Sequence, residues 1–420
     1  MSRTRDLADL INGISAAKIT SGSLDSSRIP DLSTANITSG TFANARLSSS
    51  SVTQHVDLSS IDSDYIQLRQ VDNKPNRNVI INGDMSVAQR GTSTAGLGTA
   101  NVWTTVDRVR HVFSGTNGRV TSTQESISDL AGFTKALKVA CTTADTSIAA
   151  GEYFMLQERL EGLTVQNFQK GTSLARGFAV SFYVKGNAAA TYTCELYDNT
   201  NNRQISKTFN VTSSWTRVKL LFPADTTGAI TNDNGAQLVL SIWLHAGSDF
   251  TSGTLNSNSW AATSSDIRVS SSGTSFFDST SRTFFITGLQ LEPGDQITEF
   301  EHESYEKNFD KCRRYYQTTD NDVQAAGFGY NYHHPMCTIF FPITMRAAPT
   351  VTWVNSGNNG AHSSKSGHGG IAYSSPSSCS FNQSSGSIRF FFGGGSWSAD
   401  PSEWGQSMLG QCNATLHAEP

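Results

Sequence analysis

Five acidic residues lie in or beside stretches that the sequence predicts to be β-strands, so acid–base chemistry is considered first. They are Glu152, Glu158, Glu161, Glu195 and Asp198. Paired carboxylates can cleave a glycosidic bond, one as the general acid and the other as nucleophile or base. We expect these five instead to form a solvated rim. The sequence contains no G-x-S-x-G, H-E-x-x-H or P-loop motif, and it therefore predicts no catalysis and no catalytic residue.

Aromatic residues in polar loops indicate a different chemistry, the binding of sugars. A sugar presents C–H faces that stack on flat rings and hydroxyl edges that hydrogen-bond to short polar side chains. Trp260, for example, lies in a polar insertion, LNSNSWAATSSD, that has no core pattern. For each candidate, packing between chains is the alternative role. Trp215 and Trp243 have a strand context and are expected in the core. The candidates for glycan binding are Trp103, Trp260, Tyr330, Tyr332, Tyr373, Trp397 and Trp404.

Two adjacent histidines, His333 and His334, are the candidate metal ligands. Neighbouring residues of a strand point to opposite faces, so one chain would use only one of them. Three chains could bring three copies of one histidine to a common axis, and loop histidines on a polar surface are the alternative. A Ca²⁺ ion with oxygen ligands from loops is compatible with this composition, with Asp84 as one such ligand. No other cofactor is expected.

The composition is that of an all-β protein. Of the 420 residues, 16% are charged and 37% hydrophobic, and Gly, Ser, Thr and Asn make up much of the rest. The net charge of −4 gives no electrostatic reason to expect a nucleic-acid partner. No apolar run approaches the roughly 20 residues that span a bilayer, and the N-terminus lacks the apolar core of a signal peptide. We therefore expect synthesis and folding in a cytoplasm.

Six cysteines are spread along the chain without a C-x-x-C pair. In a chain of this length without a signal peptide, this spacing predicts reduced, partly buried thiols, and a disulfide framework is the alternative. The six are Cys141, Cys194, Cys312, Cys337, Cys379 and Cys412.

A block of short strands separated by Asn, Gly and Ser turns predicts a β-sandwich. In residues 175–186, Phe178, Val180, Phe182 and Val184 alternate with smaller or polar residues, which indicates one buried face. An opening strand is expected in residues 78–93. The further strands are expected at residues 134–141, 152–160, 175–186, 191–198, 216–223, 236–247 and 281–294.

After this block, residues 297–317 predict a helix that closes the sandwich with Tyr305, Phe309, Cys312 and Tyr316 on one face and Tyr315 off it. A second β segment follows. Residues 334–354 predict two strands around a Met-Arg-Ala-Ala-Pro turn. A long Gly-, Ser- and His-rich loop comes next, then a hairpin in CSFNQSSGSIRFFFGGGSW and a last strand in QCNATLHAE.

The N-terminal region repeats itself. Ile19-Thr20-Ser21-Gly22 returns 18 residues later, at Ile37. One chain cannot bury enough surface here to offset the entropy lost on ordering. The segment is therefore either disordered or wound around other copies of itself, as three chains that stack these residues on a common axis. The expected axial residues are Ile14, Ile19, Leu24, Ile29, Leu32, Ile37, Phe42 and Leu47.

Several motifs resemble those of bacteriophage tail fibres and receptor-binding proteins. KITSGSLDSSRIPDLSTANITSGTFANARL is similar to their stem repeats, with Gly22 and Gly40 and also Arg28 and Arg46 in register. NVIINGDMSVAQRGTS, FITGLQLEPGDQITEFEHESYEKNFDKCRRYYQ, FPITMRAAPTV and the terminal CNATLHAEP resemble further segments of such fibres. The opening and closing strands, together with FYVKG and SWTRVKLLFP, are also similar to jelly-roll carbohydrate-binding modules.

The resemblance implies an all-β homotrimeric fibre in which a short N-terminal helix and an intertwined trimeric stem precede two β modules. The expected divisions are a virion-attachment segment (1–17), a stem and neck (18–77), a carbohydrate-binding-module-like jelly roll (78–300), a connecting helix (301–319) and a β-sandwich-like receptor-binding tip (320–420). No long attachment domain is visible, so the virion tail protein that would hold the N-terminus is left open.

The function expected from this resemblance is non-catalytic adsorption to a bacterial surface polysaccharide by a protein of the virion tail, assembled in the host cytoplasm. It involves neither nucleic acid nor membrane insertion. One alternative is a tailspike depolymerase that hydrolyses capsular or O-antigen polysaccharide, although no segment predicts the long central β-helix that such enzymes usually have. A secreted bacterial carbohydrate-binding module is a further alternative, but the stem repeat and the lack of a signal peptide argue against it.

Overall fold

The computed structural model describes residues 75–319, 324–329, 335–353, 361–365, 371–373, 379–392, 407–412 and 414–420. The described residues all belong to one compact unit, residues 70–420. The expected N-terminal helix and the eight axial stem residues lie outside the described residues, so the trimeric stem stays a prediction. No helix in the described part of the chain is long and apolar enough to cross a membrane.

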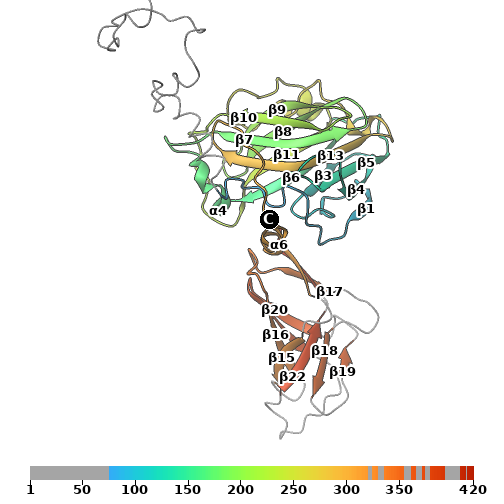
Figure 1. Cartoon of the computed structure of the whole chain (residues 1–420), viewed down its shortest axis with the longest axis vertical. Helices are drawn as coiled ribbons and strands as arrows, with labels where there is room; N and C mark the ends of the chain where they lie inside the picture. Colours follow the sequence, from blue (N-terminus) through green and yellow to red (C-terminus); the bar gives the residue numbers. More distant parts are fainter. Residues whose placement is uncertain are drawn as a thin grey trace, which may run out of the picture. The chain divides into compact units, whose positions relative to one another are not determined.

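Two antiparallel sheets form the larger β module (Figure 1). The six-stranded sheet has the order β1-β4-β5-β13-β7-β10, with bounds Ser93–Leu97, Arg119–Ser126, Lys135–Thr143, Thr283–Pro293, Phe178–Gly186 and Thr216–Phe222. The seven-stranded sheet has the order β12-β9-β8-β11-β6-β3-β2, with bounds Ala261–Ala262, Arg203–Val211, Ala190–Asp198, Ala236–Ala246, Tyr153–Glu161, Arg110–Ser114 and Val102–Trp103. The all-β sandwich predicted from the sequence is confirmed.

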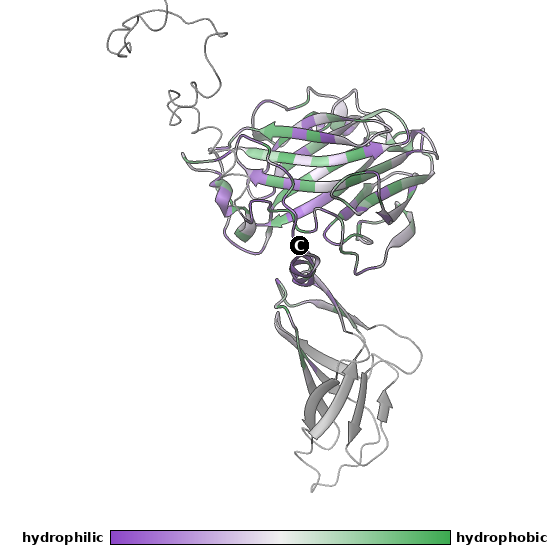
Figure 2. Cartoon of the chain, viewed as in Figure 1, coloured by the Kyte–Doolittle hydropathy of each residue, from purple (hydrophilic) through white to green (hydrophobic). Residues whose placement is uncertain are grey.

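The core lies between these two sheets. Phe178, Val180, Phe182 and Val184 of β7 are each 0% exposed and belong to one apolar cluster with residues of β6, β8 and β11. Hydrophobic and hydrophilic residues are interspersed along the strands (Figure 2), as expected where one face of a sheet packs on the other sheet. Short helices occupy the connections: α4 (Gly162–Val165), η5 (Gln166–Phe168), α5 (Ser248–Thr251), η6 (Ser265–Ile267) and η7 (Phe276–Asp278).

The opening strand expected in residues 78–93 is not formed, and that prediction was wrong. The segment is irregular as far as β1 because Asn82 and Met85 adopt positive φ values of 60° and 59°, which interrupt an extended chain. The Asn82 side chain fixes this turn: its Nδ2 donates to the carbonyls of Val87 and Asp107, at 2.9 and 3.0 Å, and its Oδ1 accepts from the Val87 amide. The asparagine thus holds the segment in place.

The helix expected in residues 297–317 is shorter than predicted, and its buried face agrees only in part with the prediction: Cys312 and Tyr316 are buried, whereas Tyr305 is not. Helix α6 spans Tyr305–Arg313 and begins at Ser304, whose hydroxyl accepts from the Lys307 amide. Tyr305 is 54% exposed, whereas Tyr315, which was expected off the buried face, is 2% exposed. Tyr315 lies beyond the end of α6, so helical spacing does not set the direction of its side chain, and the Arg108 guanidinium lies over its ring, 3.7 Å from the centroid.

The C-terminal β segment forms two further sheets. One has the order β14-β23-β17, with bounds Tyr316–Thr319, Ala414–His417 and Thr350–Trp353. The other has the order β19-β18-β22-β15-β16-β21-β20, with bounds Ile371–Tyr373, Ala361–Lys365, Ser407–Cys412, Gln324–Gly329, Pro335–Phe340, Ser387–Phe392 and Cys379–Gln383. The predicted hairpin is β20–β21. The long Gly-, Ser- and His-rich loop expected after residue 354 contains two strands, β18 and β19.

Three of the motifs that resemble phage fibre segments meet at a buried junction. Arg90, from NVIINGDMSVAQRGTS, lies over the Tyr316 ring of CRRYYQ and pairs with Glu419 of the terminal motif at 3.1 Å. Arg108 also forms an ion pair with Glu419 and lies 3.8 Å from Glu158. Glu419, next to the last residue, therefore packs against the two-sheet module.

Candidate functional site

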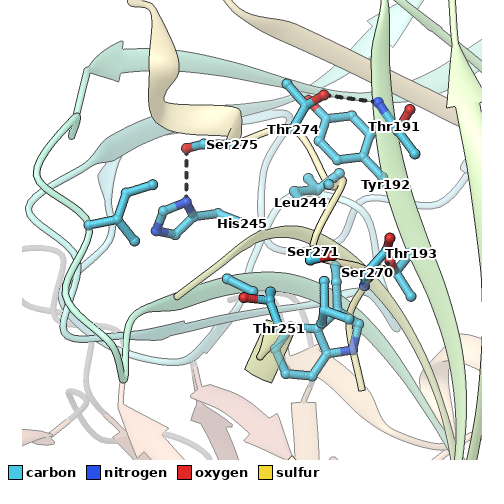
Figure 3. Close-up of a pocket in the computed structure, with 15 residues that line it drawn as sticks. Thr191, Tyr192, Thr193, Leu244, His245, Thr251, Ser270, Ser271, Thr274 and Ser275 are labelled. Carbon is cyan, nitrogen blue, oxygen red and sulfur yellow. Dashed lines mark hydrogen bonds between the residues drawn. The ribbon is translucent and has the colours of Figure 1, made fainter. Parts of the chain in front are cut away.

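A pocket of about 210 Å³ opens where β8 and β11 of the seven-stranded sheet separate (Figure 3). The two strands pair only as far as Thr193 and Trp243, and a bulge follows in β11 between Trp243 and His245. The segment that precedes η7 lies against the free end of β8, where the Thr274 amide donates to the Thr191 carbonyl at 2.8 Å. The pocket lies between that segment and the two diverging strands.

The lining of the pocket is polar but almost uncharged. Its hydroxyl groups come from Thr191, Thr193, Thr251, Ser270, Ser271, Thr274 and Ser275. Its apolar and aromatic surface comes from Ile148, Tyr192, Trp243, Leu244, Ala246 and Val269. Hydroxyl groups beside an apolar wall match the hydroxyl edge and the C–H face of a sugar ring. The pocket is smaller than the roughly 300–1,000 Å³ of sites for drug-sized ligands, which suits a short stretch of glycan.

His245 is the only ionisable side chain of the lining apart from the phenol of Tyr192. Its Nδ1 lies 2.9 Å from the Ser275 hydroxyl, and its Nε2 lies 3.5 Å from a carboxylate oxygen of Glu152 (Figure 3 shows the first contact). Burial lowers the pKa of His245, an effect that the Glu152 and Asp145 carboxylates oppose in part. The lowered pKa favours the neutral ring at pH 7. The tautomer of that ring decides whether Nδ1 donates to the Ser275 hydroxyl or accepts from it.

Trp243 is held in the pocket wall by a buried ion pair. Its indole Nε1 donates to Glu195 at 2.8 Å, and the same carboxylate accepts two bonds from Arg268, at 2.7 and 2.8 Å. The Arg268 guanidinium also lies 4.9 Å from the Trp243 ring centroid. A bidentate arginine fixes a carboxylate in one orientation, so this pair sets the position of the indole.

The five carboxylates expected on a solvated rim are all buried, so that expectation was wrong. Their exposed fractions do not exceed 3%. Each has a basic partner: Glu152 faces His245, Glu158 faces Arg108, Glu161 pairs with Arg314, Glu195 pairs with Arg268, and Asp198 pairs with Lys170. Alternation in the strands cannot reveal this arrangement, because each partner comes from a distant part of the sequence.

Burial raises the pKa of Glu158 well above its usual value, against the opposing charge of Arg108. Glu158 points into the sandwich rather than into the pocket. Within the described residues, no group of three or more His, Cys, Asp or Glu side chains could hold a metal ion. Asp84 accepts hydrogen bonds from Ser86 and Asn308.

Two of the predicted glycan-binding aromatics have described side chains. Trp260 is 7% exposed, and the expectation that it would be an exposed ring was wrong: its Nε1 donates to the Pro223 carbonyl and its ring packs on Phe178. Trp103 is half-buried, with the Arg110 guanidinium over its ring and His417 edge-on to it. Neither residue lines the pocket.

The remaining sequence candidates are not tested. Tyr373 lies in β19, where only the backbone is described. Tyr330, Tyr332, Trp397, Trp404, His333 and His334 lie outside the described residues. Trp243, which was expected in the core, is 1% exposed. Trp215, also expected there, is half-buried and not part of the core, so that prediction was wrong: its Nε1 donates to Asp129. Cys141, Cys194 and Cys312 are buried free thiols, as predicted.

No protein-family model and no curated protein matches the sequence. The chain is similar to solved structures at low identity. One is a family 11 carbohydrate-binding module from Clostridium thermocellum in complex with a mixed-linked tetrasaccharide: identity is 13%, coverage is 50% of this chain and 98% of that one, and the TM-score is 0.25. A second is TmCBM61 in complex with beta-1,4-galactotriose, with 10% identity, 52% and 99% coverage and a TM-score of 0.26.

A third similar structure is the enzymatically active domain of tailspike protein 4 from bacteriophage CBA120. It shares 11% identity, with coverage of 52% of this chain and 22% of that chain, and its TM-score is 0.26. Similarities at this level carry no argument about function. The class of this protein, an all-β protein with a two-sheet sandwich, rests on its own strand order.

Proposed function

We propose that the chain is a virion tail-fibre protein that adsorbs to a glycan of the host-cell surface and binds one uncharged part of that glycan in the β8–β11 pocket. The observation that carries the binding proposal is the lining of this pocket. Seven serine and threonine side chains line a pocket of about 210 Å³ whose wall also includes Trp243. An uncharged sugar fits, because the lining offers no charged partner to an acidic one.

The pocket is also preorganised, which favours binding. The Glu195–Arg268 pair holds Trp243, and the hydrogen bonds between Thr274 and Thr191 fix the rim. Ordering these groups in advance lowers the entropy lost when a ligand binds. The similarity to carbohydrate-binding modules that the sequence motifs suggest is in keeping with this chemistry.

The proposal is of binding without catalysis. A glycosidase requires two carboxyl groups that both face the substrate. The five carboxylates considered from the sequence are each within reach of a cation or of His245, and none of them lines the pocket. Glu195 contacts the lining through Trp243 and Glu152 through His245. These contacts favour a structural role for all five over the alternative of a tailspike depolymerase.

The tail-fibre role rests on the stem repeat and the motif resemblance. A segment that cannot fold alone and repeats its aliphatic register is explained by a homotrimer. In this proposal, the N-terminus attaches to other tail proteins, the stem joins three chains, and the two β modules of each chain face the host.

The test is a glycan microarray probed with the full-length protein, combined with mass photometry. The expected result is a trimer that binds uncharged surface glycans on the array. The corresponding free oligosaccharides should compete with the immobilised glycans for the protein. Binding to no glycan, or binding only to acidic ones, would contradict the proposal for the pocket, and a stable monomer would contradict the fibre. A halo on a lawn of host cells would favour the depolymerase.

A further inference from the structure

A buried lysine lies inside a cage of oxygen atoms at one end of the sandwich. Lys170 follows η5 and is 4% exposed. Its ammonium nitrogen donates to the carbonyls of Thr227 and Gly228 at 3.0 and 2.9 Å, forms an ion pair with Asp198, and lies 3.0 Å from an oxygen of Asp225. Two carboxylates and two backbone carbonyls thus surround one positive charge.

The cage joins the two sheets. Asp198 is the last residue of β8 in the seven-stranded sheet, and Asp225 follows β10 of the six-stranded sheet. Each carboxylate is itself oriented: Asp198 accepts from the Thr200 and Asn201 amides, and Asp225 accepts two bonds from Arg203. The oxygens are therefore fixed in place by contacts other than those with the ammonium.

Close approach of the backbone completes the cage. Gly171 has a φ of +81°, and a Cβ atom there would lie 2.3 Å from the Ala229 nitrogen. Any side chain would push away the loop that supplies the Thr227 and Gly228 carbonyls. On the remaining side, the Trp260 ring lies 5.2 Å from the Lys170 nitrogen, a cation–π distance.

Carboxylates combined with backbone carbonyls are the ligands that calcium takes in proteins. We propose that the Lys170 ammonium is the built-in structural cation of this sandwich, seated in an oxygen cage of the calcium-binding kind and joining the two sheets without a metal ion. The inference is independent of glycan binding. In this proposal, the Trp260 ring covers the ammonium.

The test compares three full-length proteins: the wild type, Lys170→Ala and Lys170→Met. Thermal unfolding is followed in EGTA and in CaCl₂. We expect the wild-type Tm to be the same in both. Lys170→Ala removes the cation and leaves room for another, so its Tm in EGTA falls below that of the wild type. Calcium at about 100 times its Kd should then raise the Tm by roughly 5–10 °C. The methionine variant fills the space without charge and should not respond.

Two results would overturn the proposal. One is a wild-type Tm that EGTA lowers, because the structural cation would then be a metal. The other is a Lys170→Ala protein whose Tm is the same with and without calcium. If that variant does not fold in EGTA, refolding in CaCl₂ must recover it. Terbium luminescence excited through tryptophan is the second readout, and it should arise in Lys170→Ala and not in Lys170→Met.

Discussion

Arg108 and Glu419, 311 residues apart in the sequence, form an ion pair in which both side chains are at most 1% exposed. Arg108 contacts Glu158 within the sandwich and Tyr315 after α6, while Glu419 also pairs with Arg90. This pair attaches the end of the chain to the two-sheet module. The motifs that contain Arg90 and Tyr315, at the two ends of that module, therefore meet at this ion pair.

Removing one partner of a buried ion pair leaves the other charge buried and uncompensated, at a typical cost of about 3–5 kcal/mol. We therefore expect Glu419→Ala to lower the free energy of unfolding by about that amount, measured by urea denaturation with tryptophan fluorescence. Glu299→Ala is the matched control: Glu299 is 77% exposed in its pair with Arg217, and its loss should cost at most about 1 kcal/mol. Equal effects of the two substitutions would mean that the Arg108–Glu419 pair stabilises the fold no more than the exposed Arg217–Glu299 pair does.

Acid should destabilise the sandwich through His111. This ring is 0% exposed and stacks on Phe154, and burial lowers the pKa of His111 from 6.5 to about 4. Because the folded-state pKa lies below the unfolded one, the unfolded state binds the proton first. The stability is present above pH 6.5 and is lost as the pH falls towards 4, by about 1.4 kcal/mol per pH unit. His111→Leu should remove this part of the slope in unfolding titrations between pH 6.5 and 4.5. An unchanged slope would show that His111 is not the group responsible.

Arg268→Lys should lower the affinity for glycan while the protein stays folded. Lysine keeps the charge beside Glu195 but cannot make the two parallel bonds to its carboxylate or place a planar guanidinium beside the Trp243 ring. The expected loss of stability is about 1–2 kcal/mol, with a reduced near-ultraviolet circular dichroism signal from the loosened indole. Glycan affinity should fall with it. If the affinity is unchanged although Trp243 is loosened, that indole does not contribute to glycan binding.

Much of the sandwich could be predicted from the sequence because its central strands alternate apolar and polar residues. β7 is the plainest case: its alternate residues Phe178, Val180, Phe182 and Val184 face the core, as the pattern indicates. β4 and β9 were missed because Ser, Thr, Gln and Lys dilute their alternation. The Val-Ile-Ile run of the opening segment is typical of a strand, whereas the asparagine turn decides the path of that segment.

The site could not be predicted in the same way. The pocket combines Thr191, Trp243, His245 and Ser275, and it exists because β11 bulges where β8 leaves it. Neither the bulge nor the contact of residues 270–275 with β8 has a local sequence signal. Of the aromatic residues predicted to bind sugars, Trp103 and Trp260 do not line the pocket. Trp260 shows that a polar surrounding sequence does not prevent a ring from being buried beside a charged lysine.

The trimeric stem has its own test. Replacing Ile19, Leu24, Ile37 and Phe42 with serine removes half of the expected axial residues. We expect the trimer seen by mass photometry to dissociate while the circular dichroism spectrum of the β modules is retained, because those modules have cores of their own. A trimer that survives the four substitutions would place the contacts between chains elsewhere.

The most direct test of the binding proposal is to block the pocket. Ser271 lines it and is exposed, so Ser271→Trp should fill the mouth without disturbing the core. Thr254→Trp is the matched control, because Thr254 is exposed in the same region of the sequence and does not line the pocket. Affinity for the best glycan of the array, measured by titration calorimetry, should fall roughly tenfold or more for Ser271→Trp, a loss of about 1.4 kcal/mol, and stay at the wild-type value for Thr254→Trp. Wild-type affinity of the Ser271→Trp protein would contradict the account.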